Sequence, residues 1–158
     1  MRARARPARG QCLECRVPFA EINWLAVLVA SVVSFVIGFA WFSPKTFFPV
    51  WWRLMGRQPD EAPESGHSMG VVFGLTVAGV LAQAVVLALV IQLIRTSGQD
   101  MTWWSGAATG ALMGVGFAAA ASLSHHLFAG FSLRAWILEV GQDIVCLAAM
   151  GAILGAWA

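Results

Sequence analysis

The sequence predicts an all-α membrane protein, an antiparallel bundle of four transmembrane helices. Hydrophobic residues make up 59% of the 158 residues and charged residues only 11%, whereas a soluble domain carries about 25% charged residues. The apolar residues are concentrated in four stretches, each long enough for a helix to cross a hydrocarbon core about 30 Å thick. Composition and segment length therefore both indicate a chain that lies in a lipid bilayer.

Four helices are expected in a single membrane domain that covers residues 21–158. They lie at about 22–42, 69–94, 101–124 and 135–157. Polar residues close the apolar stretches, such as Arg95 after the second and His125 after the third. The second and third connections are short, so neighbouring helices should run in opposite directions.

Tryptophan supports these boundaries, because its ring is apolar while its N–H needs a partner and it therefore prefers the headgroup level. All eight tryptophans fall near a predicted boundary, and we expect them to be interfacial anchors: Trp24, Trp41, Trp51, Trp52, Trp103, Trp104, Trp136 and Trp157. The segment "KTFFPVWWRLMG" after the first helix should lie in the interface. The Pro-rich polar stretch that follows it is expected to be an exposed loop.

Small residues recur at four-residue spacing, a pattern that lets membrane helices approach closely. On the third helix the stripe consists of Gly106, Gly110, Gly114, Ala118 and Ser122. Corresponding stripes are Gly70, Gly74, Ala78 and Ala82 on the second helix, and Gly151 and Gly155 on the fourth. Because lipid tails are as apolar as leucine, close packing must help to hold the helices together, and we expect these glycines to pack against other helices.

Charged residues also occur inside the last apolar stretch. The segment "ILEVGQDIV" places Glu139 and Asp143 four residues apart, on one face of a helix. If that helix starts near residue 135, they lie about 6 Å and 12 Å further into the membrane. The short connection should bring the end of the third helix close by. We therefore expect a polar intramembrane site formed by Asp143, Glu139, His125, His126 and Gln142.

Two interpretations of this site stay open. Ionisable residues inside a span are costly and commonly mark proton, ion or ligand sites, and a carboxylate beside a histidine can exchange protons near neutral pH. Alternatively, Glu139 complements the positive end of the fourth helix and Asp143 is a hydrogen-bonded packing residue. The sequence favours neither for Asp143 and favours the structural interpretation for Glu139. Adjacent histidines point in different directions on a helix, which argues against both binding one metal.

Residues 1–20 form a basic arm that is expected to be disordered or to precede the true translation start, for which Val17 is a candidate. With the arm, the balance of Lys and Arg predicts cytoplasmic termini; without it, both termini should face outward. Cys12 and Cys15 form a lone CxxC, which is weak evidence for a metal or redox site, because a tetrahedral metal site needs about four ligands. Cys146 is expected to be a packing residue.

Several stretches resemble a known family. The segments "EINWLAVLVASVVSFVIGFAWFSP", "WWRLMG" and "MGAILGAW" are similar to the bacterial family of small integral membrane proteins known as domain of unknown function 1761. The similarity covers roughly residues 22–157. It implies a four-helix membrane protein of unknown activity, and it assigns no catalytic residues.

Three functions fit these observations. The first is a non-enzymatic protein of the bacterial cytoplasmic membrane whose polar site handles a proton or a small polar or cationic solute. The second is a structural or accessory membrane subunit, and the third is a thiol oxidoreductase that uses Cys12 and Cys15. We expect no catalytic residue, no metal and no cofactor, since no motif for them is present. The expected partners are the lipid bilayer and, in a homo-oligomer, further copies of the chain. The net charge of +2 argues against nucleic acid.

Overall fold

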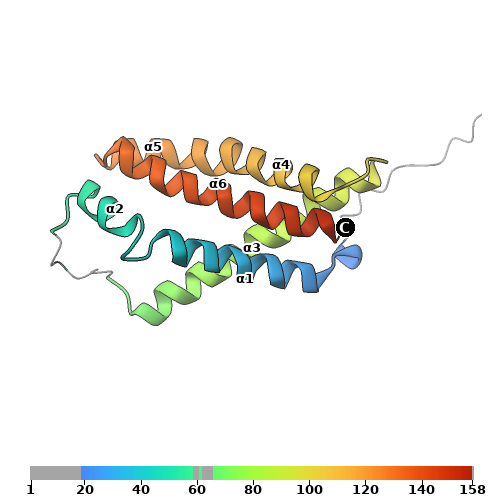
Figure 1. Ribbon diagram of the computed structural model, residues 1–158, viewed down its shortest axis with the longest axis horizontal. Coiled ribbons are helices and arrows are strands. Elements are labelled where there is room, and N and C mark those ends of the chain that lie inside the picture. The colour runs from blue at the N-terminus through green and yellow to red at the C-terminus, as the bar shows by residue number, and fades with distance from the viewer. Residues whose placement is uncertain (1–18, 59–60, 62–65, 158) are drawn as a thin grey trace, which may run out of the picture.

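The computed structural model describes residues 19–58, 61 and 66–157, and every regular element in this part of the chain is a helix. Four helical segments are long and apolar enough to cross a membrane, and they are Trp24–Trp41, Met69–Thr96, Trp103–Phe128 and Leu133–Ala156. Figure 1 shows them as an antiparallel bundle, with the start of the first span and the end of the last at the same end. The predicted fold class is therefore confirmed. The arm with Cys12 and Cys15 lies outside the described residues.

The bounds of the elements are η1 Phe19–Glu21, α1 Trp24–Trp41, α2 Phe48–Leu54, α3 Met69–Thr96, α4 Trp103–Met113, η2 Gly114–Ala119, α5 Ala120–Phe128 and α6 Leu133–Ala156. The connections between α3 and α4 and between α5 and α6 are short, whereas the one between α2 and α3 is longer. Gly98 and Gly130 have positive φ angles of 86° and 74° just after α3 and α5. This left-handed conformation favours glycine and closes a helix sharply, so both tight connections depend on it.

Side-chain caps fix where three of the spans begin. The Asn23 side chain accepts a hydrogen bond from the backbone N–H of Ala26 at the start of α1. Thr102 and Ser105 cap α4 reciprocally, each side chain accepting from the other residue's backbone N–H. Ser132 caps α6 by accepting from the N–H of Arg134. These bonds satisfy backbone donors that a helix start leaves without an intrahelical partner.

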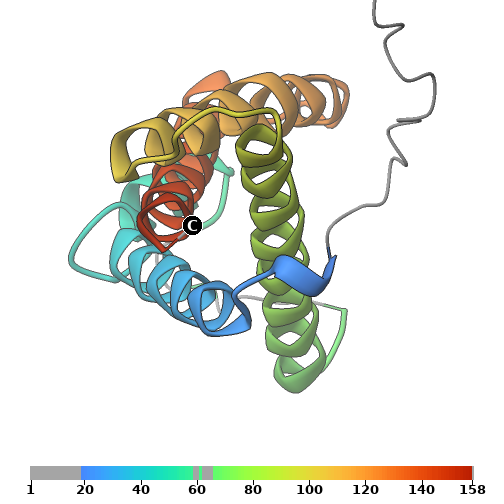
Figure 2. The same cartoon turned by 90° about the vertical axis from the view of Figure 1, so that its right-hand side faces the viewer.

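Helix α6 is the centre of the bundle and contacts α1 to α5 as well as η2. Figure 2 shows it between α1 on one side and α4 and α5 on the other. Its packing against α4 depends on glycine, because a Cβ on Gly106 would collide with the carbonyl oxygen of Gly151, and one on Gly110 with that of Leu147. Only residues without a side chain allow these backbones to touch.

The third span contains a π-helical segment, η2, where the sequence predicted a continuous α-helix. A π turn contains one residue more than an α turn. The residues after it are therefore rotated about the helix axis, and different positions of the sequence face α6. Gly114 lies against Ile144 of α6, and the next buried residue is Ala119 rather than Ala118, which the four-residue spacing had indicated. Ser122 still faces α6, since its hydroxyl accepts a hydrogen bond of 3.0 Å from Nε1 of Trp136.

Helix α3 joins the core mainly through its C-terminal half. Ala84, Leu87, Ala88 and Ile91 are buried, together with Met150 of α6. The N-terminal half inclines away from α4 and α5 (Figures 1 and 2). Gly70 and Gly74 consequently have open space around them within the chain, which differs from the helix contact expected for them.

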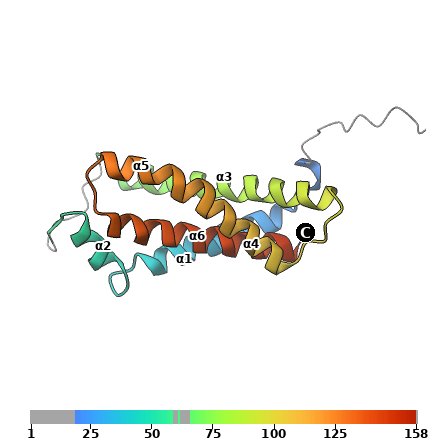
Figure 3. The same cartoon turned by 90° about the horizontal axis from the view of Figure 1, so that it is seen from above.

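Tryptophans lie near the ends of the spans or in α2, and their role as interfacial anchors stays a prediction. Trp103 and Trp104 stack on one another at the start of α4, with ring centroids 4.2 Å apart. Trp52 of α2 stacks on Phe48 and donates to the backbone carbonyl of Gln58. Helix α2 lies beside the start of α6 (Figure 3). This end of the bundle, which holds α2 and the α5–α6 connection, is called the α2 end below.

Candidate functional site

The α5–α6 connection brings a histidine and a carboxylate together at the α2 end. His126 lies near the end of α5 and Glu139 in the second turn of α6. Nδ1 of His126 lies 3.5 Å from Oε2 of Glu139, within the range of an ion pair if the imidazole is protonated.

His126 is the histidine of the site, and His125 is not part of it. The His126 side chain is only 12% exposed, and its ring lies 5.3 Å from that of Phe131. Its second ring nitrogen, Nε2, is buried and has no hydrogen-bond partner in the described structure. His125 is exposed, because neighbouring residues on a helix point in different directions. An unpartnered buried nitrogen requires an explanation, since such atoms are rare in folded proteins.

Glu139 also binds α2. Its Oε1 accepts a hydrogen bond of 2.7 Å from Nε1 of Trp51, so the carboxylate joins α2 to α5 through its two oxygens. The Glu139 side chain is 31% exposed. The sequence indicated Trp51 as an interfacial anchor but not as a donor to Glu139. The only signal for that role was the need of a partly buried indole N–H for a partner.

Asp143 lies one turn deeper, about 15 Å along α6 from Leu133 and so close to the middle of the span. It shares a face of α6 with Met150, which packs in the core with α3. Because the N-terminal half of α3 inclines away, that face is less well covered at Asp143, which is half-buried. Within the described residues no hydrogen bond or ion pair reaches its carboxyl group. Asp143 therefore lacks the bonds that a purely structural carboxyl group should have.

Gln142 was expected in this site, but it faces α1. Its Nε2 lies 3.2 Å from Sγ of Cys146 and close to Gly38 of α1. The thiol of Cys146 in turn donates to the carbonyl oxygen of Ser34 at 3.5 Å. Residues 142 and 143 point in different directions because consecutive helical residues are about 100° apart. Gln142 and the buried Cys146 thus belong to the contact between α1 and α6.

The same end of the bundle is closed by a second indole. Nε1 of Trp41, at the end of α1, donates to the carbonyl oxygen of Leu138 at 3.2 Å. The tryptophan ring also contacts Phe47, with centroids 4.8 Å apart. The site therefore lies under a cover made by α2 and the end of α1. No group of three or more His, Cys, Asp and Glu side chains in the described chain could hold a metal ion.

Comparison with known families agrees with the resemblance noted in the sequence. The family described as "Protein of unknown function (DUF1761)" matches residues 25–155. The chain belongs to this family. No curated protein and no solved structure matches the chain. The chain is thus a multi-pass, four-helix member of a family whose activity is not known.

Proposed function

We propose that this protein handles protons in the membrane through His126, Glu139 and Asp143, as a minimal carrier of protons or of a small polar or cationic solute. The observation that carries the proposal is the His126–Glu139 pair, with Nδ1 and Oε2 3.5 Å apart and the buried Nε2 without a partner. A proton on this imidazole pairs with the carboxylate, and Nε2 then becomes a donor to an incoming water or solute.

Asp143 supplies the next step inward. It lies one helical turn, or about 6 Å, beyond Glu139 on the same face of α6. Carboxyl groups inside a span are kept where they bind or relay charge, and the carboxyl group of Asp143 has no hydrogen bond in the described structure. The sequence of groups from the interface inward is therefore His126, Glu139 and Asp143, with the half-open face of α6 as the route.

The test uses proteoliposomes of the full chain loaded with a pH-sensitive dye, in which proton uptake is followed after an acid step. Asp143→Asn keeps the shape of the side chain but cannot ionise, and we expect it to abolish the protein-dependent uptake. His126→Gln should reduce uptake at least tenfold, whereas the matched change His125→Gln should leave it intact, because His125 is exposed and outside the pair. Equal uptake by the His126 and His125 variants would refute the role of the pair.

A structural role is the second candidate, and one observation favours it. The bond of 2.7 Å from Trp51 to Glu139 joins α2 to the bundle, as expected of a carboxylate that only holds an interfacial helix in place. In an accessory subunit of this kind, Asp143→Asn would be silent. Infrared difference spectra separate the two functions, since a proton-handling carboxyl band of Asp143 must change between about pH 5 and 8 and must vanish in the Asn variant.

For location we propose the cytoplasmic membrane of a bacterium, on the basis of the four apolar spans and the resemblance to a bacterial family. Lys45, Arg53, Arg57 and Arg134 belong to the α2 end, whereas Arg95 belongs to the other end. Without the arm of residues 1–20, these residues favour a cytoplasmic α2 end under the positive-inside rule, whereas the arm reverses the balance. Reporter fusions at residue 58 and after residue 158 test the orientation of the armless chain, and a fusion at residue 58 that reports the outer side would contradict a cytoplasmic α2 end.

A further inference from the structure

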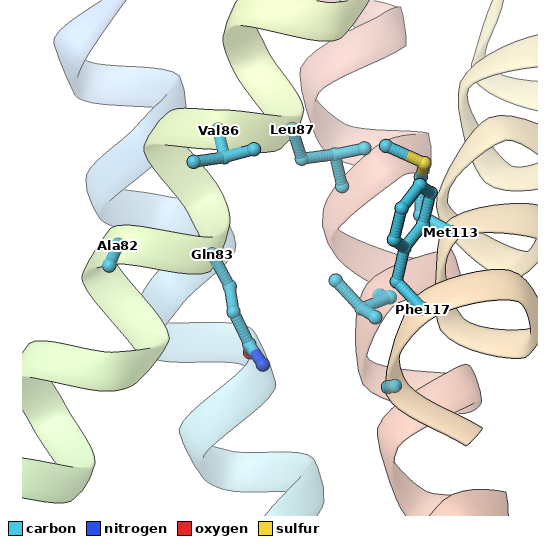
Figure 4. A pocket seen from close by; sticks show the side chains of 8 residues that line it. Ala82, Gln83, Val86, Leu87, Met113 and Phe117 are labelled. Atoms are coloured by element: carbon cyan, nitrogen blue, oxygen red, sulfur yellow. The ribbon is translucent and has the colours of Figure 1, made fainter. Parts of the chain in front are cut away.

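The lipid-facing surface contains an apolar groove between α3 and the third span, bordered by Leu147, which lies one turn of α6 beyond Asp143. Its volume is about 520 Å³. Val86 and Leu87 of α3 line one wall, Met113 and Phe117 of the third span line the other, and Leu147 of α6 also borders it. Figure 4 shows Leu87 of α3 on one side of the space between the helices, with Met113 and Phe117 of the third span on the other. The groove exists because α3 inclines away from α4 and α5.

One amide interrupts this apolar lining. Gln83 is exposed, and its side chain extends from α3 beside the groove (Figure 4). It is the fifteenth of the 28 residues of α3 and so lies near the middle of the span. No hydrogen bond joins it to another group in the described part of the chain. An amide without a partner in hydrocarbon is unfavourable by several kcal/mol, so the groove calls for an occupant with polar groups.

The surface beside Gln83 allows another helix to come close. Gly79 lies one turn before Gln83 on the same face, and a Cβ added there would meet nothing within 4 Å. Ala82, the neighbouring residue, also lines the groove. Small residues next to a polar one are the features by which membrane helices associate, since the backbones approach and the polar groups hydrogen-bond.

We propose that this groove is the interface between two copies of the chain, with α3 of each copy in the groove of the other and the two Gln83 amides hydrogen-bonded across a twofold axis. A lipid tail fits the apolar walls but offers no hydrogen-bonding group at this depth. An amide carries both donors and an acceptor, and a twofold axis makes the same residue its own partner. The groove shares no residue with the proton-handling site, although Leu147 at its border lies one turn beyond Asp143. The two proposals can fail separately, because the test of this one measures dimerisation and not proton uptake.

The experiment measures dimerisation of the full chain in phosphatidylcholine–phosphatidylglycerol vesicles, by energy transfer between C-terminal fluorophores at several protein-to-lipid ratios. Gln83→Leu should weaken the dimer about tenfold, the range expected for interhelical hydrogen bonds. Gln83→Asn keeps an amide and should weaken it less. Gly79→Leu should prevent the approach of the backbones. The matched control is Ala108→Leu, which adds the same bulk to an exposed position of α4 that does not line the groove.

Each result decides the proposal. A dimer that is lost with Gln83→Leu and Gly79→Leu but kept with Ala108→Leu supports it, provided that circular dichroism shows the same helix content in all variants. A chain that stays monomeric at every ratio overturns it, and so does a dimer that none of these changes weakens. Native mass spectrometry that finds a monomer with one phospholipid, lost in Gly79→Leu, would assign the groove to lipid instead and would also overturn it.

Discussion

Helix α6 and the N-terminal half of α3 are both membrane helices with small residues, yet they behave in opposite ways. Gly151 and Gly155 of α6 lie so close to α4 that a Cβ on either would collide with backbone atoms. Gly70 and Gly74 of α3 have open space around them. The difference lies in the opposing surface, since Gly151 meets Gly106, whereas no glycine of another helix meets the stripe of α3. A small-residue stripe therefore produces close packing when a second stripe faces it in register.

Substitution of a glycine in the tight region should have the largest effect. Gly110→Leu places a side chain where the carbonyl of Leu147 lies, and overpacking of this kind destabilises by about 2–3 kcal/mol or more. We expect a marked loss of folded protein in detergent, measured by thermal unfolding with circular dichroism. Ala108→Leu, on an exposed face of the same helix, should be mild, and similar unfolding of the two variants would show that the α4–α6 contact is not tight.

Removal of the indole donor at the other end of α6 should have an intermediate effect. Trp51→Phe keeps an aromatic ring but leaves Oε1 of Glu139 without the bond of 2.7 Å, and such a loss at a charged group is worth about 1.5–3 kcal/mol. Because the carboxylate is partly exposed to water, we expect the loss of stability to lie at the lower end of this range. The free energy of unfolding in detergent measures it, with Trp104→Phe at an exposed position as control. Equal free energies of unfolding for Trp51→Phe and Trp104→Phe would show that α2 is held by its other contacts alone.

The same type of substitution in the open region should be nearly silent in the monomer. Gly74→Leu meets no atom within 4 Å, so the free energy of unfolding should change by no more than about 0.5 kcal/mol. The higher helix propensity of leucine acts in the stabilising direction. If Gly74→Leu lowered the free energy of unfolding in monodisperse detergent as much as Gly110→Leu does, α3 would pack along its whole length. The difference drawn here between α6 and the N-terminal half of α3 would then be wrong.

The smallest effect is expected in the loop after α2, far from both regions. The side-chain hydrogen bond from Arg57, at 2.6 Å, and the backbone N–H of Gln58 hold the pKa of Glu61 below its usual value. Since this pKa is lowered in the folded chain, the pair contributes at neutral pH and its contribution fades as pH falls below about 4. The group is fully exposed, so unfolding temperature should not respond. NMR titration of the Glu61 carboxyl in wild type and Arg57→Gln measures the shift, which should become smaller in the variant but persist in part, because the Gln58 N–H still donates to the carboxylate.

Sequence alone was sufficient for the spans because their length and apolar character are set by the bilayer and not by tertiary contacts. It also indicated that a histidine and Glu139 meet, since a short connection leaves α5 and α6 no other arrangement. It could not select His126 over His125, because the choice depends on the rotation of α5. That rotation follows from η2, which begins at Gly114. The regular four-residue spacing of Gly106, Gly110 and Gly114 therefore gives no sign of its additional residue.

The groove beside Gln83 was not predicted for a related reason. Periodicity identifies which residues share a face of a helix, but it contains no information about how far that helix leans from its neighbours. The stripe of α3 suggested close packing between residues 70 and 82, whereas the buried residues of α3 begin at Ala84. A glutamine in the middle of an apolar span was the one signal available, because such a residue needs a polar partner.

The central position of α6 also determines the order in which this fold can form. Each apolar span is stable as a separate helix in the bilayer, and association is a later stage. Ribosomes add α6 after α1 to α5, so the earlier helices enter the membrane before the helix that all of them contact exists. Until Gly151 is synthesised, Gly106 and Gly110 face lipid and His126 has no Glu139 to pair with. Assembly of the bundle around its centre and completion of its polar site thus coincide with the insertion of the last helix, α6.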